Sequence, residues 1–546
     1  MQPYGIGRLG LALGGAGLMW FVFGSRAGQA AETAWPLTVA ERSGYTSTSQ
    51  SAEVVDYLHM LADRAPHIRC FDIGTTKEGR PLTAVVAAQP PVSDFAISPR
   101  DARLRVLLLG NIHSGECDGK EALLMLLREL AAQPDHPWLQ QMVLVFVPNY
   151  NADANDRMNK DNRPGQVGPV NGMGERANAQ GFDLNRDFIK LEALETQALV
   201  RVINSWDPHA FFDLHTTNGS RHRYPLTYDV PHHPASPLAL RQFLRDTMLP
   251  TVTQRLEEQE IGTFYYGNFS RDYTQWETYG DEPRYSIEYM GMRGRLAILV
   301  ESYAYVSYEE RIVASREFVR QCLDYLAPRA AEVHTLLASS GARDDSASAS
   351  VPAASVPLQT EVKPLAAPVT VRGYRRQQDQ DGRWQNTDEP QDYQVAFLTD
   401  YQPTLSVSRP YAYVVPANAT AILDRLRQHG IQLACLSREV TGDIESLTIE
   451  SVQRAARAYQ GHRATRVTVQ PASGQRTVPQ GSWVALSDQP LGVLLTYLLE
   501  PESADGFVNW DLWEPPLAAS TEYPVWRIRA PVELPLAAPP SSPSSS

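Results

Sequence analysis

Short apolar runs alternate with segments of helical spacing over the first 336 residues of the chain. The apolar runs, which we interpret as strands, lie at 104–109, 143–147, 211–214 and 296–300. Segments with apolar side chains at helical spacing lie at 120–133, 190–204 and 307–326. Strands that are apolar at most positions are typical of sheets covered on both faces. The pattern therefore predicts an α/β fold with a mixed, largely parallel sheet and helices on both faces.

The pattern changes after residue 356. An apolar run at 411–415, a helix at 418–428 and a second run at 431–436 are followed by strands of alternating polarity. Such a mixture, with more strand than helix, is typical of an α+β fold. We therefore expect a second, smaller and strand-rich α+β domain at the C-terminal end.

Composition suggests where the domains begin and end. Residues 337–356 are rich in Ala, Ser and Pro, as interdomain linkers are. This places a first domain at 45–336 and the second at 357–535. Residues 536–546 are of low complexity, and we expect a disordered tail there.

The first 30 residues have the pattern of a signal peptide. Arg8 precedes an apolar run at 9–23, and Gly28-Gln29-Ala30 supplies the small residues of a cleavage site. The alternative is a membrane anchor, but about 15 apolar residues are fewer than the ~20 that span a bilayer. We therefore expect cleavage after Ala30, a periplasmic or secreted protein, and no membrane span afterwards.

Composition and charge exclude several classes of protein. The chain has 546 residues, of which 43% are hydrophobic and 20% charged, so disorder throughout is excluded. Its net charge of -13 argues against a nucleic-acid partner, because phosphate backbones attract basic surfaces. The four cysteines form no C-x-x-C pair, and their pairing stays open.

Candidate metal ligands follow the predicted strands. His113 and Glu116 come after the first apolar run, His215 after the third and Glu301 after the last. Because the carboxyl ends of parallel strands meet at one edge of a sheet, we expect these four side chains to converge. Two histidines and one glutamate leave zinc a fourth position for water, and the spare carboxylate can accept that water's proton.

Another histidine pair gives a competing signal for a metal site. His232 and His233 are adjacent, but they lie between Pro231 and Pro234. We assign this pair to a surface loop.

Five short motifs resemble the zinc carboxypeptidase family, the metallocarboxypeptidases similar to carboxypeptidases A and B. They are Glu78-Gly79-Arg80, His113-Ser114-Gly115-Glu116, Asn151-Ala152-Asp153, Asp183-Leu184-Asn185-Arg186 and Leu299-Val300-Glu301. The resemblance covers roughly residues 45–330 and implies a carboxypeptidase-like fold. With its leader and its second domain, the chain resembles an exported bacterial member with an appended C-terminal domain.

The resemblance also implies roles for individual residues. His113, Glu116 and His215 match the ligands of one zinc ion per chain, and Glu301 matches the catalytic general base. Asn185 and Arg186 match the pair that binds the terminal carboxylate of the substrate, a role that suits a bidentate guanidinium. Asp183 matches a carboxylate that orients a zinc-binding histidine.

For two further roles, the resemblance leaves three candidate residues each. The arginine that stabilises the oxyanion is one of Arg157, Arg163 and Arg176, among which we select Arg157. The hydroxyl donor over the bound peptide is one of Tyr279, Tyr285 and Tyr289, among which we select Tyr289. Gly115 departs from the arginine of the family's digestive enzymes, so one substrate contact is lost or replaced.

These motifs predict a zinc-dependent metallocarboxypeptidase that acts on peptides with a free C-terminus. One alternative is an amidase or endopeptidase on cell-wall peptides, which also exist on this scaffold. The other is a non-catalytic peptide-binding relative. The preferred C-terminal residue is left open, because the pocket floor lies in the poorly matched stretch 264–294.

Overall fold

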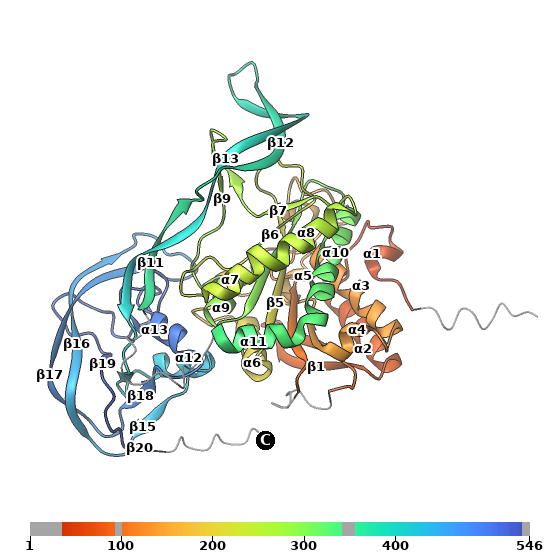
Figure 1. Cartoon of the computed structure of the whole chain (residues 1–546). Helices are drawn as coiled ribbons and strands as arrows, with labels where there is room; N and C mark the ends of the chain where they lie inside the picture. The colour runs from red at the N-terminus through yellow and green to blue at the C-terminus, as the bar shows by residue number, and fades with distance from the viewer. Residues whose placement is uncertain (1–34, 93–100, 341–354, 538–546) are drawn as a thin grey trace, which may run out of the picture. The chain divides into compact units, whose positions relative to one another are not determined.

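The computed structural model describes residues 35–92, 101–340 and 355–537 (Figure 1). Residues from Leu37 onward group into one compact unit. The predicted signal peptide, 1–30, lies outside the described residues, as does most of the predicted linker. Within the described ranges, no helix is both long enough and apolar enough to cross a membrane.

The N-terminal part is built on an eight-stranded mixed sheet with the strand order β1-β2-β4-β3-β5-β10-β6-β7. Its strands are β1 (Ile68–Thr75), β2 (Pro81–Ala87), β3 (Leu104–Gly110), β4 (Met142–Val147), β5 (Ala210–Thr217), β6 (Leu226–Asp229), β7 (Thr263–Tyr265) and β10 (Leu296–Tyr303). The central strands β4, β3, β5 and β10 are parallel to their neighbours in this row, whereas β1 and β2 form an antiparallel hairpin. The predicted mixed, largely parallel sheet is therefore confirmed.

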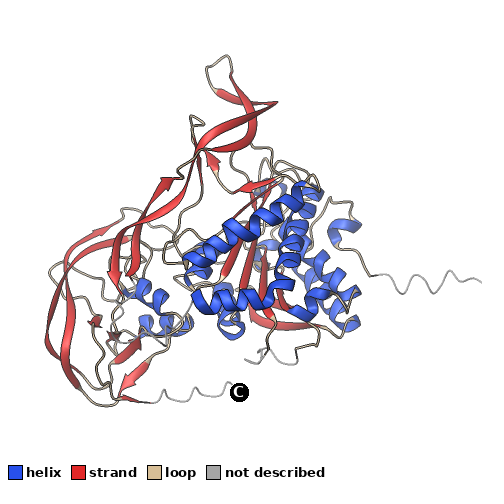
Figure 2. Ribbon diagram, in the orientation of Figure 1, coloured by secondary structure: helices blue, strands red, loops and turns tan. Residues whose placement is uncertain are grey.

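Helices cover both faces of this sheet (Figure 2). The helices are α1 (Val39–Arg42), α2 (Ser51–Arg64), α3 (Asp118–Ala132), α4 (Pro137–Gln141), α5 (Ala152–Asn155), α6 (Leu194–Trp206), α7 (Leu238–Gln242), α8 (Leu249–Glu257), α9 (Ser286–Met292), α10 (Tyr308–Leu326) and α11 (Ala330–Ser340). Successive strand residues such as Leu107 and Leu108 point to opposite faces, and both are fully buried. This is why the strands are apolar at nearly every position.

One glycine sets the distance between α3 and the sheet. A Cβ added at Gly119 would lie 2.6 Å from the Cβ of Leu214 in β5, closer than such atoms pack. The first turn of α3 therefore lies directly against β5. This contact brings the loop before α3 close to the end of that strand.

The C-terminal part is strand-rich, with two further sheets and the helices α12 (Thr420–Gln428) and α13 (Gly492–Leu499). One sheet contains β8 (Asn268–Phe269), β9 (Gln275–Glu277), β11 (Ser355–Pro364), β12 (Val369–Gln378) and β13 (Trp384–Ser408). The other contains β14 (Ala412–Val415), β15 (Ala434–Leu436), β16 (Val440–Arg454), β17 (Thr465–Val478), β18 (Trp483–Leu486), β19 (Trp526–Ile528) and β20 (Leu536–Ala537). The predicted strand-rich α+β class is confirmed.

The N-terminal and C-terminal parts share a β-sheet and a hydrophobic cluster. Strand β13 pairs in parallel with β9, which belongs to the N-terminal part. One hydrophobic cluster also joins Leu199 of α6 to Leu423 of α12 and Leu494 of α13. At the edges, α11 extends into the predicted linker and β20 occupies the start of the predicted tail. The domain boundaries therefore stay a prediction.

Candidate metal centre and active site

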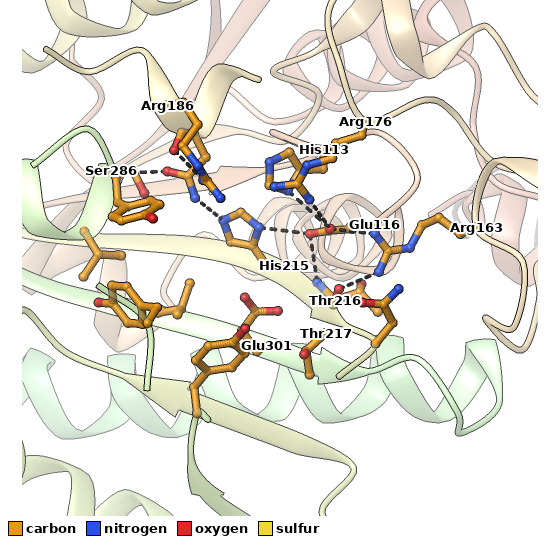
Figure 3. Close-up of a pocket in the computed structure, with 17 residues that line it drawn as sticks. His113, Glu116, Arg163, Arg176, Arg186, His215, Thr216, Thr217, Ser286 and Glu301 are labelled. Carbon is orange, nitrogen blue, oxygen red and sulfur yellow. Dashed lines mark hydrogen bonds and ion pairs between the residues drawn. The ribbon is translucent and has the colours of Figure 1, made fainter. Parts of the chain in front are cut away.

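Three predicted metal ligands meet at the carboxyl edge of the main sheet. His113 and Glu116 lie in the loop between β3 and α3, and His215 lies near the end of β5. All three side chains are buried, and their candidate ligand atoms lie within 4.8 Å of one another. Glu116 lies between His215 and Arg163 in Figure 3. The convergence expected from the strand order is therefore present.

His215 and Glu301 are inside strands, not after them as the apolar runs suggested. Strand β5 continues to Thr217 and β10 continues to Tyr303. The reason is the parallel pairing of these two strands, which carries their hydrogen-bond ladder past the apolar residues. Both side chains still reach the same pocket.

The geometry of the two histidines fits a metal ion. His113 Nδ1 is 3.2 Å from Glu116 Oε1, and His215 Nδ1 is 2.9 Å from Glu116 Oε2. The opposite nitrogen of each ring contacts a carboxylate, Nε2 of His113 at 2.9 Å from Asp183 and Nε2 of His215 at 3.0 Å from Asp213. These carboxylates fix the rings with Nδ1 directed at Glu116, as outer carboxylates do around metal-binding histidines.

An orphaned atom supports the same conclusion. His113 Nδ1 is buried and, although it lies 3.2 Å from Glu116 Oε1, forms no hydrogen bond of acceptable geometry within the described part of the chain. A buried ring nitrogen without a partner is unfavourable unless another group occupies the space before it. Two imidazoles and a carboxylate are the donor set of many catalytic zinc sites. The residues present therefore fit zinc.

Charge is concentrated around these ligands. Burial opposes ionisation of Glu116 and Asp183, but the facing His113 and the nearby arginines Arg163 and Arg176 hold the pKa of both carboxyls well below the usual range. Burial likewise opposes protonation of His215, whereas the Asp213 carboxylate raises its pKa. The Glu116 and Asp183 carboxyls therefore stay ionised beside the two histidines.

Glu301 faces the same pocket from β10. Burial raises the pKa of its carboxyl to about 8, and the Glu116 carboxylate adds to this effect while His215 opposes it. A carboxyl that titrates near neutral pH can both accept and return a proton.

The predicted carboxylate-binding pair enters the pocket from the short helix η2 (Leu184–Arg186). The Asp183 side chain accepts a hydrogen bond from the Asn185 N–H and so caps this turn. Asn185 Oδ1 accepts a hydrogen bond of 2.9 Å from the N–H of Ser286, which joins η2 to α9. Arg186 lies 4.5 Å from the centre of the Tyr285 ring. Asn185 and Arg186 are thus held on the rim of the metal centre.

Arg157 does not line the pocket. Its guanidinium forms ion pairs with Glu78 and Glu175, and its side chain is partly exposed. Arg163 and Arg176, the other two candidates, both line the pocket. All three lie in a loop without regular strands, so no periodicity could tell which side chains point inward.

Arg163 occupies the space that a side chain at position 115 would need. A Cβ added at Gly115 would lie 2.6 Å from Arg163 Cδ. The Arg163 side chain passes over Gly115, and its Nη1 donates a hydrogen bond of 2.7 Å to Glu116 Oε1. A guanidinium from another loop therefore occupies the space beside Gly115.

Tyr289 does not line the pocket either. It is fully buried, and its hydroxyl contacts His429 Nδ1 at 3.0 Å. Ser286 and Ile287 at the start of α9 line the pocket, whereas Tyr289, nearly one turn further along the helix, contacts His429 instead. The tyrosines that line the pocket are Tyr266, Tyr279 and Tyr285.

The assignment of His232 and His233 to a surface loop is wrong. The two residues are only 1% and 2% exposed. Their backbone N–H groups donate to the Glu288 carboxylate at 2.8 and 3.0 Å. The flanking prolines indicated a turn, but they did not indicate that the buried Glu288 carboxylate accepts hydrogen bonds from that turn.

Asp213 is a contact of His215 that was not predicted from the sequence. It lies two residues before His215 on the same strand, so the alternation of side chains places both on one face. Its Oδ2 also accepts a hydrogen bond from the Ser286 hydroxyl. The two-residue alternation of side chains along a strand could therefore have predicted the contact between Asp213 and His215.

Comparisons with known proteins agree with this geometry. A family model described as zinc carboxypeptidase matches residues 54–279, a range that contains the three candidate ligands and ends before Glu301. Carboxypeptidase 2 of Trichophyton rubrum is 23% identical over 459 residues, which cover 79% of this chain and 78% of that protein. Human carboxypeptidase Z is 30% identical over 144 residues, which cover 25% of this chain and 21% of that protein.

Among solved structures, a metallo-carboxypeptidase from Burkholderia cenocepacia aligns with a TM-score of 0.38 at 16% identity, over 51% of this chain and 69% of that one. The family match and the three converging ligands lie in the same stretch of sequence. Residues 54–279 of the chain therefore resemble the zinc carboxypeptidase family.

Proposed function

We propose that the protein is a zinc-dependent metallocarboxypeptidase that releases residues from the free C-terminus of peptides. One observation carries this proposal: the three candidate zinc ligands, the carboxyl of Glu301 and the carboxylate-binding pair Asn185 and Arg186 line one pocket. To release the last residue of a peptide, a site needs the metal ligands, the general base and the carboxylate-binding pair close together, because only one residue separates the bond that is cut from the terminal carboxylate. The proposal assigns one zinc ion to each chain.

The bound zinc ion would supply a Lewis acid that polarises the scissile carbonyl and acidifies the attacking water. Arg186 and Asn185 bind the terminal carboxylate of the peptide and so place the last peptide bond over the metal ligands. Glu301 accepts the proton of the attacking water and returns it to the leaving amine. Asp183 and Asp213 keep the two histidine rings in orientation.

The arrangement changes two of the expected assignments. We propose Arg176, in place of Arg157, as the donor to the carbonyl oxygen as negative charge develops there. Its side chain is 49% exposed, it lines the pocket, and Asp183 holds its guanidinium. We assign the hydroxyl donor to Tyr279 or Tyr285, in place of Tyr289, because these two side chains line the pocket.

Export remains part of the proposal. It rests on the signal-peptide pattern of residues 1–30 in the sequence. A periplasmic or secreted peptidase would meet peptide ends outside the cytoplasm. Comparison of the N-terminal residue of the mature protein with the predicted cleavage after Ala30 would test this part separately.

The two alternatives are not favoured. An amidase or endopeptidase has no need for a guanidinium that binds a terminal carboxylate. A non-catalytic peptide-binding protein has no need for a carboxyl such as Glu301 beside the metal ligands. Zinc content and turnover of amidated peptides separate these alternatives from an exopeptidase.

The zinc-loaded protein should release the last residue of a peptide with a free C-terminus and leave the same peptide with a C-terminal amide intact. Glu301→Gln should reduce kcat by about 10²–10⁴-fold while zinc content stays the same, because a positioned base commonly contributes this much. The exposed Glu450→Gln is a matched control. Equal cleavage of both peptides, or full activity of Glu301→Gln, would contradict the proposal.

A further inference from the structure

A turn from the strand-rich part of the chain contacts the carboxylate-binding helix. The turn Tyr459–His462 lies between β16 and β17 and reaches η2. The Tyr459 hydroxyl accepts a hydrogen bond of 2.9 Å from Arg186 Nε. Gln460 Oε1 accepts a hydrogen bond of 2.9 Å from the N–H of Asp183. Two residues of the appended part thus bind two residues of the proposed active site.

The backbone of this turn is shaped for these contacts. Tyr459 and His462 exchange two backbone hydrogen bonds, of 2.7 and 3.1 Å. Gln460 and Gly461 between them have φ angles of 50° and 84°. A non-glycine residue in this left-handed region is uncommon and costs energy. The bond from Asp183 to the Gln460 side chain offsets part of that cost.

The turn is also anchored on its other side. His462 Nε2 lies 2.9 Å from a carboxylate oxygen of Glu192, in the segment between η2 and α6. The Tyr459 ring stacks on Trp510 with 6.3 Å between ring centres, and the Arg284 guanidinium lies over Trp510 at 4.9 Å. The hydroxyl of Tyr459 therefore has a fixed position relative to η2.

The contact has a direct consequence for Arg186. Its Nε is engaged by Tyr459, its Nη1 donates to the Asn185 carbonyl at 2.8 Å, and its face packs on Tyr285. A guanidinium held on three sides loses little freedom when it binds a carboxylate, which increases affinity. Tyr459 is itself 47% exposed, so its hydroxyl adds little to the folded core.

We propose that Tyr459 is a positioning residue that orients Arg186 for the terminal carboxylate of the peptide, and that Gln460, through the N–H of Asp183, holds the start of η2 in place. The C-terminal part of the chain is then a component of the substrate site. The inference rests on the proposed function of Arg186 as a carboxylate-binding residue, and it adds a specific task for the appended sheet.

Tyr459→Phe tests the inference, because it removes the hydroxyl and keeps the ring. The matched control is Tyr411→Phe, whose half-buried hydroxyl forms no hydrogen bond within the described residues. Binding is measured by calorimetry in a Glu301→Gln background, with one peptide as free acid and as C-terminal amide. Loss of a hydrogen bond to a charged group at a half-exposed site should weaken free-acid binding by about three- to tenfold. Binding of the amide, zinc content and the control should not change.

Kinetics give a second readout. With Glu301 present, Tyr459→Phe should raise KM for free-acid peptides by a similar factor and change kcat by less than about twofold, because it alters only uniform binding. Should Tyr459→Phe fail to fold, Gln460→Ala, which alters a partly exposed turn, serves as the second variant. Its expected effect is also selective for the free acid.

The inference is overturned if Tyr459→Phe and Gln460→Ala bind the free acid as tightly as the parent protein does. A selective loss supports it even if the parent shows no turnover, because binding does not depend on cleavage. Failure of the proposed function has a different signature: the parent protein itself would not distinguish the free acid from the amide.

Discussion

Glu301 and His215 are directly paired residues on the neighbouring parallel strands β10 and β5. The pairing places the proposed base beside a proposed zinc ligand through the hydrogen-bond ladder of the sheet, not through a flexible loop. Sites built on strands hold their side chains more exactly than loops do. The separation between these two groups therefore depends on the register of β5 and β10.

Removal of zinc should abolish activity and lower stability together. His113, Glu116 and His215 are buried, and without a metal ion the orphaned nitrogen of His113 is unsatisfied. A strong chelator should therefore lower Tm by several degrees, and one equivalent of zinc should restore both Tm and activity. Scanning calorimetry with metal analysis checks this. A chelated protein with unchanged Tm and full activity would exclude the metal centre.

Arg176→Ala should reduce kcat by about 10²–10³-fold, the usual effect of removing one donor to a developing oxyanion. Arg157→Ala is the matched control, because its guanidinium pairs with Glu78 and Glu175 away from the pocket. We expect its kcat to stay within about threefold of the parent protein. Steady-state kinetics at saturating peptide measure both variants. The reverse order of effects would restore Arg157 as the donor.

Gly115→Ala should weaken zinc binding through Arg163. The added Cβ would lie 2.6 Å from Arg163 Cδ, so the guanidinium must move from Glu116. Overpacking of this kind costs about 1–3 kcal/mol of unfolding free energy. Gly442→Ala is the control, since nothing lies within 4 Å of its added Cβ.

Chelator competition and urea unfolding measure the two effects of Gly115→Ala. The double variant Gly115→Ala/Arg163→Ala should lose less than the sum of the single variants, because both act on one contact. Strict additivity would show that Gly115 and Arg163 act independently.

Glu288 should make the stability of the zinc-free protein depend on pH. Burial raises the pKa of its carboxyl from 4.5 to about 8, although the N–H groups of His232 and His233 oppose the shift. Between these two pH values the unfolded chain has released a proton that the folded chain retains. The free energy of unfolding should therefore fall as pH rises from about 4.5 to about 8, and then level off.

Glu288→Gln should remove this contribution, so the difference in unfolding free energy between parent and variant should change with pH over that range. Glu450→Gln, at an exposed site, should leave the pH profile unchanged. Urea unfolding at a series of pH values measures all three proteins. A pH-independent difference between Glu288→Gln and the parent would show that Glu288 does not titrate in this way.

Most of the proposed metal centre was predictable from the sequence. The order of apolar runs placed His113, Glu116, His215 and Glu301 at one sheet edge, and the motif around Asn185 indicated the pair Asn185 and Arg186 that lines the same pocket. Arg157 and Tyr289 were selected for roles in the pocket, but neither side chain lines it. Their surroundings are an irregular loop and a short helix, where neither a period of two nor a period of 3.6 reveals which side chain faces the pocket.

The sequence by itself determined the α/β class, the candidate ligand set and the strand-rich character of the C-terminal part, because these follow from local periodicity and from residue types in order. Only the tertiary structure decided which arginine reaches Glu116, which tyrosines line the pocket, and that Tyr459 contacts Arg186. The last two residues are 273 positions apart in the chain. Contacts of this kind depend on how separate elements pack against one another, and local spacing carries no information about that packing.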